Sequence, residues 1–183
     1  MANRTATYFA FDGLGQDNPT KSDFRFYATI KMWTASKDIE FRCVNSHDKA
    51  NAVRGTSLMA TLRASILKRL AASKNMVVII SSDTRKAGSL LSWEIEKAVD
   101  TYDLPLLVCY TRYKRIVDPA SHAAKWPNTL EDRILNKTAQ AIHMPFKKCA
   151  ILDAINRFTV NGEEVGGSFV HYKKEVQDRW NES

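Results

Sequence analysis

The chain has 183 residues, of which 44% are hydrophobic and 26% charged, a balance typical of a globular protein that excludes wholesale disorder. No apolar run approaches the roughly 18 residues needed to cross a bilayer, and the first residues lack the basic and apolar regions of a signal peptide. We therefore expect a soluble cytoplasmic protein with no membrane partner.

The net charge and the metal-binding residue types narrow the possible functions of the protein further. The formal net charge of +7 suits an anionic ligand, and basic runs such as "TRYKR" at 111–115 are as typical of solvated loops as of a nucleic-acid interface. We favour the solvated loop and expect no nucleic-acid partner. The three cysteines lie far apart and the four histidines show no ligand spacing, which predicts free thiols and no metal site.

Short apolar segments alternate with helical patterns over the first part of the chain. Strands are expected at 5–13, 39–45, 76–80 and 104–110, and helices at 22–33, 57–73 and 88–102. The continuous run "MVVII" at 76–80 is typical of a strand buried on both faces of a parallel sheet. The alternation predicts an α/β fold, a doubly wound parallel sheet of about five strands with helices on both faces.

The remaining sequence gives a weaker pattern. Residues 111–138 are polar and are expected to be irregular, followed by a strand at 139–144 and a helix at 145–158. The tail carries Gly166-Gly167 between two apolar pieces and is expected to form a hairpin or a short packed segment. We therefore predict one α/β domain, residues 1–158, with a C-terminal extension, 159–183, that packs on it.

Ligands of an open α/β sheet bind beyond the carboxyl ends of its strands. The loops 12–21, 45–56 and 81–89 should meet at that edge. The candidate substrate-binding residues are Phe11, Asp12, Gly13, His47, Asp48, Ser81 and Ser82, together with Trp93 on the helix that follows the third loop. An aromatic ring can stack on a base, a glycine lets backbone N–H groups approach a phosphate, and the polar side chains can bind ribose or phosphate. The competing interpretations are core packing for the neighbouring Phe9, loop capping for Asp48 and helix capping for the serines.

The helix expected at 88–102 carries adjacent Trp93 and Glu94 within about two turns of its start. On a helical wheel Glu94 flanks the buried face, so an ordinary charged rim position competes with a functional carboxylate. Trp93 points away from the sheet, where a large aromatic side chain suits a partner chain or a covering segment. Periodicity alone leaves the role of both residues open.

Several enzyme motifs are absent from the sequence. The "GLG" at 13–15 is not the GxGxxG fingerprint, and neither GxxxxGK[ST] nor GxSxG occurs. These absences disfavour a hydride-transferring Rossmann enzyme, a P-loop phosphotransferase and a serine hydrolase.

The order and spacing of several segments over most of residues 7–158 carry a family resemblance. They are "YFAFDG" at 8–13, a helix ending in Trp33, "NSHDK" at 45–49, "LRASILKRLAASKNMVVIIS" at 62–81, "SWEIEKAV" at 92–99 followed by "DLPLLVCY", and "HMPFKK" at 143–148. In these segments the chain resembles the TIR-like family of bacterial and archaeal antiphage defence, which contains the Thoeris TIR-like sensors. It departs from many TIR enzymes in having Leu90-Leu91 where a Trp-Cys pair often stands.

This resemblance implies a flavodoxin-like fold and a catalytic role for Glu94 in cleaving NAD. NAD would be the substrate, with no further cofactor, and the product would be an ADP-ribose-derived, hydrolysed or cyclic signal nucleotide that reaches a downstream effector. The resemblance also implies a homo-oligomer and a phage-derived trigger. Breaking the nicotinamide–ribose bond fits a lone carboxylate, because nicotinamide leaves as a neutral base. The alternatives are a non-catalytic TIR-like scaffold and a nucleoside deoxyribosyltransferase-like enzyme.

Overall fold

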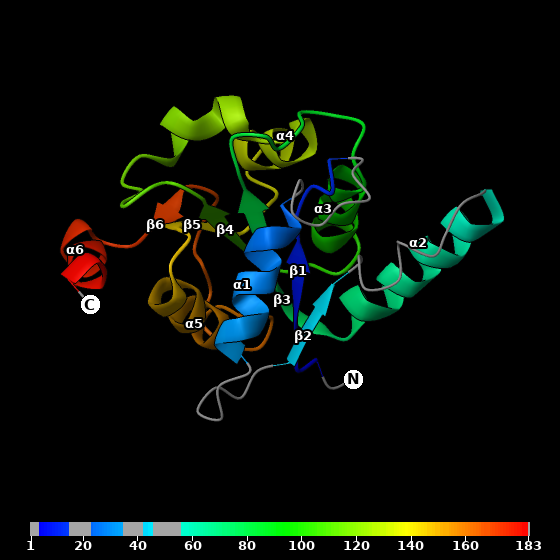
Figure 1. Cartoon of the computed structure of the whole chain (residues 1–183), viewed down its shortest axis with the longest axis horizontal. Helices are drawn as coiled ribbons and strands as arrows, with labels where there is room; N and C mark the ends of the chain where they lie inside the picture. The colour runs from blue at the N-terminus through cyan, green and yellow to red at the C-terminus, as the bar shows by residue number, and fades with distance from the viewer. Residues whose placement is uncertain (1–3, 15–22, 35–41, 46–55, 183) are drawn as a thin grey trace.

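The computed structural model of the chain describes residues 4–14, 23–34, 42–45 and 56–182. These residues form a six-stranded parallel sheet with helices on both faces (Figure 1). The strands are β1 Ala6–Ala10, β2 Arg42–Asn45, β3 Ser73–Ile80, β4 Leu106–Tyr110, β5 Ala141–Pro145 and β6 Val170–His171. The helices are α1 Phe24–Thr34, α2 Thr56–Ala71, α3 Leu90–Asp100, the 3-10 helix Pro119–Lys125, α4 Asn128–Leu135, α5 Lys148–Arg157 and α6 Lys174–Glu182.

The strand order β2-β1-β3-β4-β5-β6 confirms the predicted doubly wound α/β, flavodoxin-like fold. The chain moves outward from β1 to β2 and then returns to β3 on the other side of β1. All pairings are parallel, including Tyr8 of β1 with Met76 of β3. In such a sheet the ligand crevice lies where the order reverses, which here is the carboxyl edge of β1 and β3.

Each face of the sheet carries its own apolar core, because successive side chains of a strand point to opposite faces. Tyr8 and Ala10 of β1 pack with α2, α3 and α4 in what we call the α3-side core. Phe9 and Phe11 pack with α1 and α5 in the α1-side core. The central strands are buried on both faces, which explains the uninterrupted apolar runs in the sequence.

The prediction of an irregular segment at 111–138 is wrong. This segment contains the 3-10 helix Pro119–Lys125 and α4, whose Leu130 and Ile134 are fully buried in the α3-side core. This eight-residue helix has only three apolar residues, and one of them, Leu135, is exposed. So short a helix is marginal by itself, and its packing against α3 stabilises it.

The C-terminal residues add to the sheet instead of forming a hairpin. Val170 of β6 pairs in parallel with Ile142 of β5, and α6 follows. The amide of Gln177, buried in α6, donates to the carbonyl of Ile116 and accepts from its N–H, which fixes the helix on the body of the protein. A strand of two residues carries no detectable alternation, which is why the sequence suggested about five strands.

Within the described part of the chain, the helices are all too short or too polar to cross a membrane.

Candidate functional site

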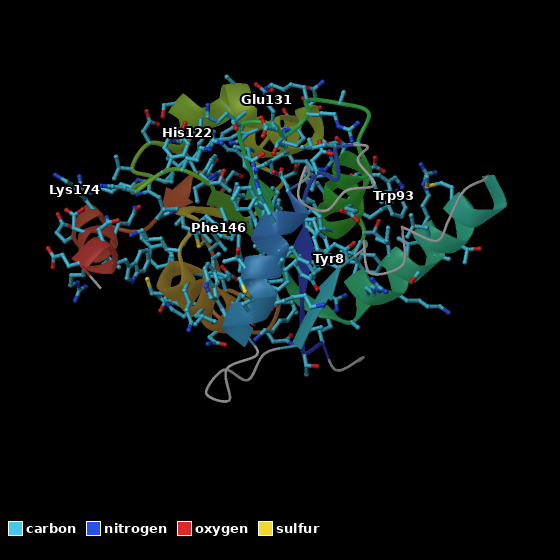
Figure 2. All side chains as sticks on the ribbon, viewed as in Figure 1. Tyr8, Trp93, His122, Glu131, Phe146 and Lys174 are labelled. Atoms are coloured by element: carbon cyan, nitrogen blue, oxygen red, sulfur yellow. The ribbon has the colours of Figure 1, made fainter. Side chains whose placement is uncertain are left out.

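Glu94 lies inside the protein. Its exposed fraction is 0%, and it shares the buried face of α3 with Leu91, Ile95 and Ala98. The hydroxyl of Tyr8, which β1 directs toward α3, donates a hydrogen bond of 2.8 Å to Oε1 of Glu94 (Figure 2 labels Tyr8). The rim position that the helical wheel allowed is therefore wrong.

A glutamate with no exposed surface is unusual, because removing a carboxylate from water is costly unless polar partners replace the solvent. At this position an apolar residue would extend the α3-side core without that cost. The polar pair of Tyr8 and Glu94, buried among apolar side chains of the α3-side core, is thus the kind of buried ionisable group that often marks a functional site.

Trp93 is half-buried and packs against the α3-side core. The guanidinium of Arg63 on α2 lies 5.2 Å from the centre of its ring, on the side of α3 that faces α2 (Figure 2). Of the two neighbours expected for this ring, a partner chain or a covering segment, the structure shows a covering segment, the helix α2.

Asp12 and Arg85 join the loops that follow β1 and β3. The buried Asp12 carboxylate accepts from Arg85 Nε at 2.9 Å, Arg85 Nη2 at 2.7 Å and the Arg85 backbone N–H at 2.9 Å. The backbone N–H of Leu14 donates to it as well, at 2.8 Å. Burial acts to raise the pKa of Asp12, but the hydrogen bonds from Arg85 and Leu14 hold it below its ordinary value.

Asp23, just before α1, lies beside the same loops and is fully buried. Its Oδ2 accepts hydrogen bonds from the hydroxyls of Ser81 at 2.9 Å and Thr84 at 3.3 Å. Burial raises the pKa of Asp23 to about 6, and the nearby charge of Asp12 adds to this shift, although the two hydroxyls oppose it. We call Asp12, Asp23, Ser81, Thr84 and Arg85 the edge cluster.

The other predicted substrate-binding residues lie in different surroundings, from the apolar core to the surface. The ring of Phe11 is buried in the α1-side core, stacked on Tyr27 with ring centres 5.6 Å apart. Gly13 is half-buried beside Asp12, and Ser82 is exposed with its hydroxyl near Asp83. His47 and Asp48 lie outside the described residues.

The structure therefore brings Asp12 and Ser81 together at the edge, while Glu94 lies deeper, under α3. Asp23, Thr84 and Arg85 were not among the predicted site residues. The one signal that could have found them is the polar run 81–86, which directly follows the buried strand β3.

A second set of buried polar side chains lies on β4 and β5. The Tyr110 hydroxyl lies 2.8 Å from His143 Nδ1, Trp126 Nε1 donates to the Tyr110 oxygen at 2.6 Å, and His143 Nε2 lies 2.9 Å from the Ser168 carbonyl oxygen. We call these four residues the His143 cluster. In the part of the chain that is described, no group of three or more His, Cys, Asp or Glu side chains could hold a metal ion.

A comparison with known families bears on the same region. The family model of the TIR-like domain of Thoeris protein ThsB matches residues 8–116, more than half of the chain. The match runs from β1 to just beyond β4, and it contains Tyr8, Glu94, Asp12 and Arg85. The resemblance found in the sequence is thereby confirmed, and the chain belongs to the family of Thoeris ThsB TIR-like domains.

Proposed function

We propose that this protein is an NAD-consuming enzyme of Thoeris antiphage defence that cleaves the nicotinamide–ribose bond with the carboxylate of Glu94. The observation that carries the proposal is the fully buried Glu94, hydrogen-bonded by Tyr8, within the region that matches the TIR-like family. The product is an ADP-ribose-derived signal nucleotide, which we expect to be cyclic.

In the proposed reaction the bond between ribose C1′ and the pyridinium nitrogen breaks, and its electron pair leaves with nicotinamide as a neutral base. The ribose becomes an oxocarbenium-like cation, which a carboxylate stabilises by its charge or by hydrogen bonds to the ribose hydroxyls. Water then attacks C1′ and loses a proton, or a nucleophilic atom of the same bound dinucleotide attacks and closes a ring.

The surroundings of Glu94 suit this role. The apolar side chains of the α3-side core lower the local dielectric constant, and an opposite charge interacts more strongly in such an environment than in water. The Tyr8 hydroxyl holds one carboxylate oxygen and so fixes the orientation of the group before the substrate arrives. Tyr8 is a positioning residue in this proposal, since it acts through Glu94.

The edge cluster suits the diphosphate of the same substrate. Asp12 holds Arg85 through Nε and Nη2, while 42% of the Arg85 side chain remains exposed at the carboxyl edge. A guanidinium fixed in this way is preorganised to donate to phosphate oxygens. Asp12 follows Tyr8 by four residues, two beyond the end of β1, and four extended residues span about 13 Å, a separation suited to an extended dinucleotide.

The proposal extends to the partners that a Thoeris protein implies. We propose a homo-oligomer in the active state, a phage-derived trigger, and an effector that the small-molecule product reaches by diffusion. A scaffold without turnover is less well supported, because the partial burial of Trp93 beside Arg63 weakens one of the two features that favoured it, the other being the basic surface.

The test is mass spectrometry of the small molecules formed from NAD, with and without lysate of phage-infected cells. We expect nicotinamide and an ADP-ribose-derived product with the native chain and none above background with Glu94→Gln. Glu96→Gln is the matched control, because Glu96 lies on the same helix but is partly exposed and paired with Lys97. Turnover that survives in Glu94→Gln, or a reaction with free deoxynucleosides but not NAD, contradicts the proposal.

A further inference from the structure

A pocket of about 540 Å³ lies on the α1 side of the sheet, between α1, the start of α5, and α6. In Figure 1 these three helices are the blue, brown and red ones, with α5 between the other two. We call it the α5 pocket, and its lining residues are Trp33, Phe146, Lys147, Lys148, Cys149, Leu152 and Trp180. This volume falls within the range of small-molecule sites, about 300–1,000 Å³.

Three aromatic rings from three separate elements form its walls. Trp33 comes from α1, Phe146 from the turn after β5, and Trp180 from α6, and the rings of Trp33 and Phe146 have centres 5.4 Å apart. Flat, polarisable surfaces of this kind bind planar rings, since each stacked base or comparable ring adds about 1–3 kcal/mol.

The positive charges of the pocket gather at one end, where α5 begins. Lys147 donates to the Trp180 carbonyl at 3.1 Å, which holds its ammonium group near the pocket, and Lys148 is exposed. Lys147 is also the N-cap of the ten-residue helix α5, and within the described part of the chain it makes no side-chain capping hydrogen bond. Among the described residues that line the pocket, none is an acidic side chain that could neutralise the two lysines. This end is therefore complementary to an anion.

We propose that the α5 pocket binds a small planar aromatic phosphate, of which a purine mononucleotide is the simplest example. The ring lies against Trp33, Phe146 and Trp180, and the phosphate lies at Lys148 and the first turn of α5. The site is separate from the proposed catalytic site, because Glu94 belongs to the α3-side core on the opposite face of the sheet. Its occupancy does not depend on any NAD turnover.

The first experiment uses Cys149 as a reporter inside the pocket. The full-length chain is alkylated with iodoacetamide with and without millimolar AMP, and the modification of Cys149 is followed by peptide mass spectrometry. Cys109 is buried, so it serves as an internal reference. We expect AMP to slow alkylation of Cys149 by about tenfold at saturation, whereas adenosine and ribose 5-phosphate, each lacking half of the ligand, protect weakly.

The second experiment separates this site from an unspecific attraction to the basic surface. Lys148→Glu reverses the exposed charge in the pocket, and Lys68→Glu makes the same change on exposed Lys68 of α2, on the other face of the sheet. We expect calorimetric AMP affinity to fall about tenfold or more with Lys148→Glu and to change less than about twofold with Lys68→Glu. Unchanged Cys149 alkylation with AMP, equal protection by adenosine, or equal losses in both variants overturns the proposal.

Discussion

The edge cluster and the His143 cluster both contain buried polar side chains, yet they differ in charge. The edge cluster, just beyond the ends of β1 and β3, contains two carboxylates and one guanidinium, and one of the carboxylates, Asp23, has a pKa raised to about 6. The His143 cluster on β4 and β5 consists of neutral groups. Burial lowers the pKa of His143 to about 4, so its ring stays uncharged at neutral pH.

The proton positions of the His143 cluster follow from its donors. The indole of Trp126 can only donate, so the Tyr110 oxygen accepts from it and its own proton must go to His143 Nδ1. His143 then carries its proton on Nε2 and donates to the Ser168 carbonyl. Each group is satisfied without charge, which is the arrangement that stabilises a fold. In the edge cluster the carboxyl group of Asp23 has a raised pKa, so its charged form costs stability, and this difference separates the two clusters.

The largest expected effect is on turnover. We expect Glu94→Gln to lower NAD cleavage by about 10²–10⁴-fold, because the neutral amide cannot stabilise the ribose cation. Its thermal stability should change little, since the amide has the same shape as the carboxyl group and keeps an oxygen that can accept from Tyr8. Product formation by chromatography and Tm by differential scanning fluorimetry check both parts. A large loss of Tm would show that Glu94 stabilises the fold instead.

The His143 cluster should respond in the opposite way. We expect His143→Phe to lower the free energy of unfolding by about 2–4 kcal/mol, because the Tyr110 hydroxyl and the Ser168 carbonyl lose their buried partner. Activity per folded molecule should change little. His171→Phe is the control, since His171 is exposed and its substitution should change stability by less than about 0.5 kcal/mol. Urea denaturation measures all three chains.

How much of the fold and of these clusters the sequence could predict depends on how far apart in the chain the interacting residues stand. The strands of the sheet were predictable, because "MVVII" and "LPLLVCY" are continuous apolar runs between helical segments, and the family match confirms the TIR-like resemblance. The depth of Glu94 was not, because a wheel gives only an angle around the helix. Whether that angle meets solvent or the Tyr8 hydroxyl depends on how α3 sits on the sheet.

Contacts between residues that stand far apart in the sequence were likewise not predictable. Asp12 was singled out as a loop residue, but the Arg85 that holds it stands 73 positions later in a run of ordinary polar residues. Their encounter follows from the parallel pairing of β1 with β3, which brings the two loops to one edge. Roles predicted for His47 and Asp48 stay predictions.

An intermediate effect is expected from the Asp12–Arg85 pair. Asp12→Asn should lower the free energy of unfolding by about 1–3 kcal/mol, because a buried carboxylate that accepts four donor groups is lost. Asp100→Asn is a matched control, since Asp100 also binds an arginine, Arg133, through both oxygens, but 46% of its side chain is exposed. A change below about 1 kcal/mol is expected there. Equal losses would contradict the contrast between buried and exposed pairs.

The smallest expected effect is on the pH dependence of stability, because the contributions of Asp23 and His143 have opposite signs and nearly cancel. The raised pKa of Asp23, about 6 against 3.8, means that the folded state binds more protons between these values, so its contribution to stability falls as pH rises. The lowered pKa of His143, about 4 against 6.5, means that the unfolded state binds more protons, so its contribution rises with pH. The pKa of Asp12 lies below its ordinary value of 3.8, so Asp12 affects the pH dependence of stability mainly at pH values below this window.

The two opposing slopes are each at most about 1.4 kcal/mol per pH unit, so the native chain should show a nearly flat stability between about pH 4 and 6. Asp23→Asn removes the falling part, and its stability should rise by about 2–3 kcal/mol across the window. His143→Phe removes the rising part, and its stability should fall by a similar amount. Urea denaturation at several pH values measures these slopes. Parallel curves for the three chains would mean that neither buried group titrates differently in the fold, and the contrast between a charged edge cluster and a neutral His143 cluster would then fail.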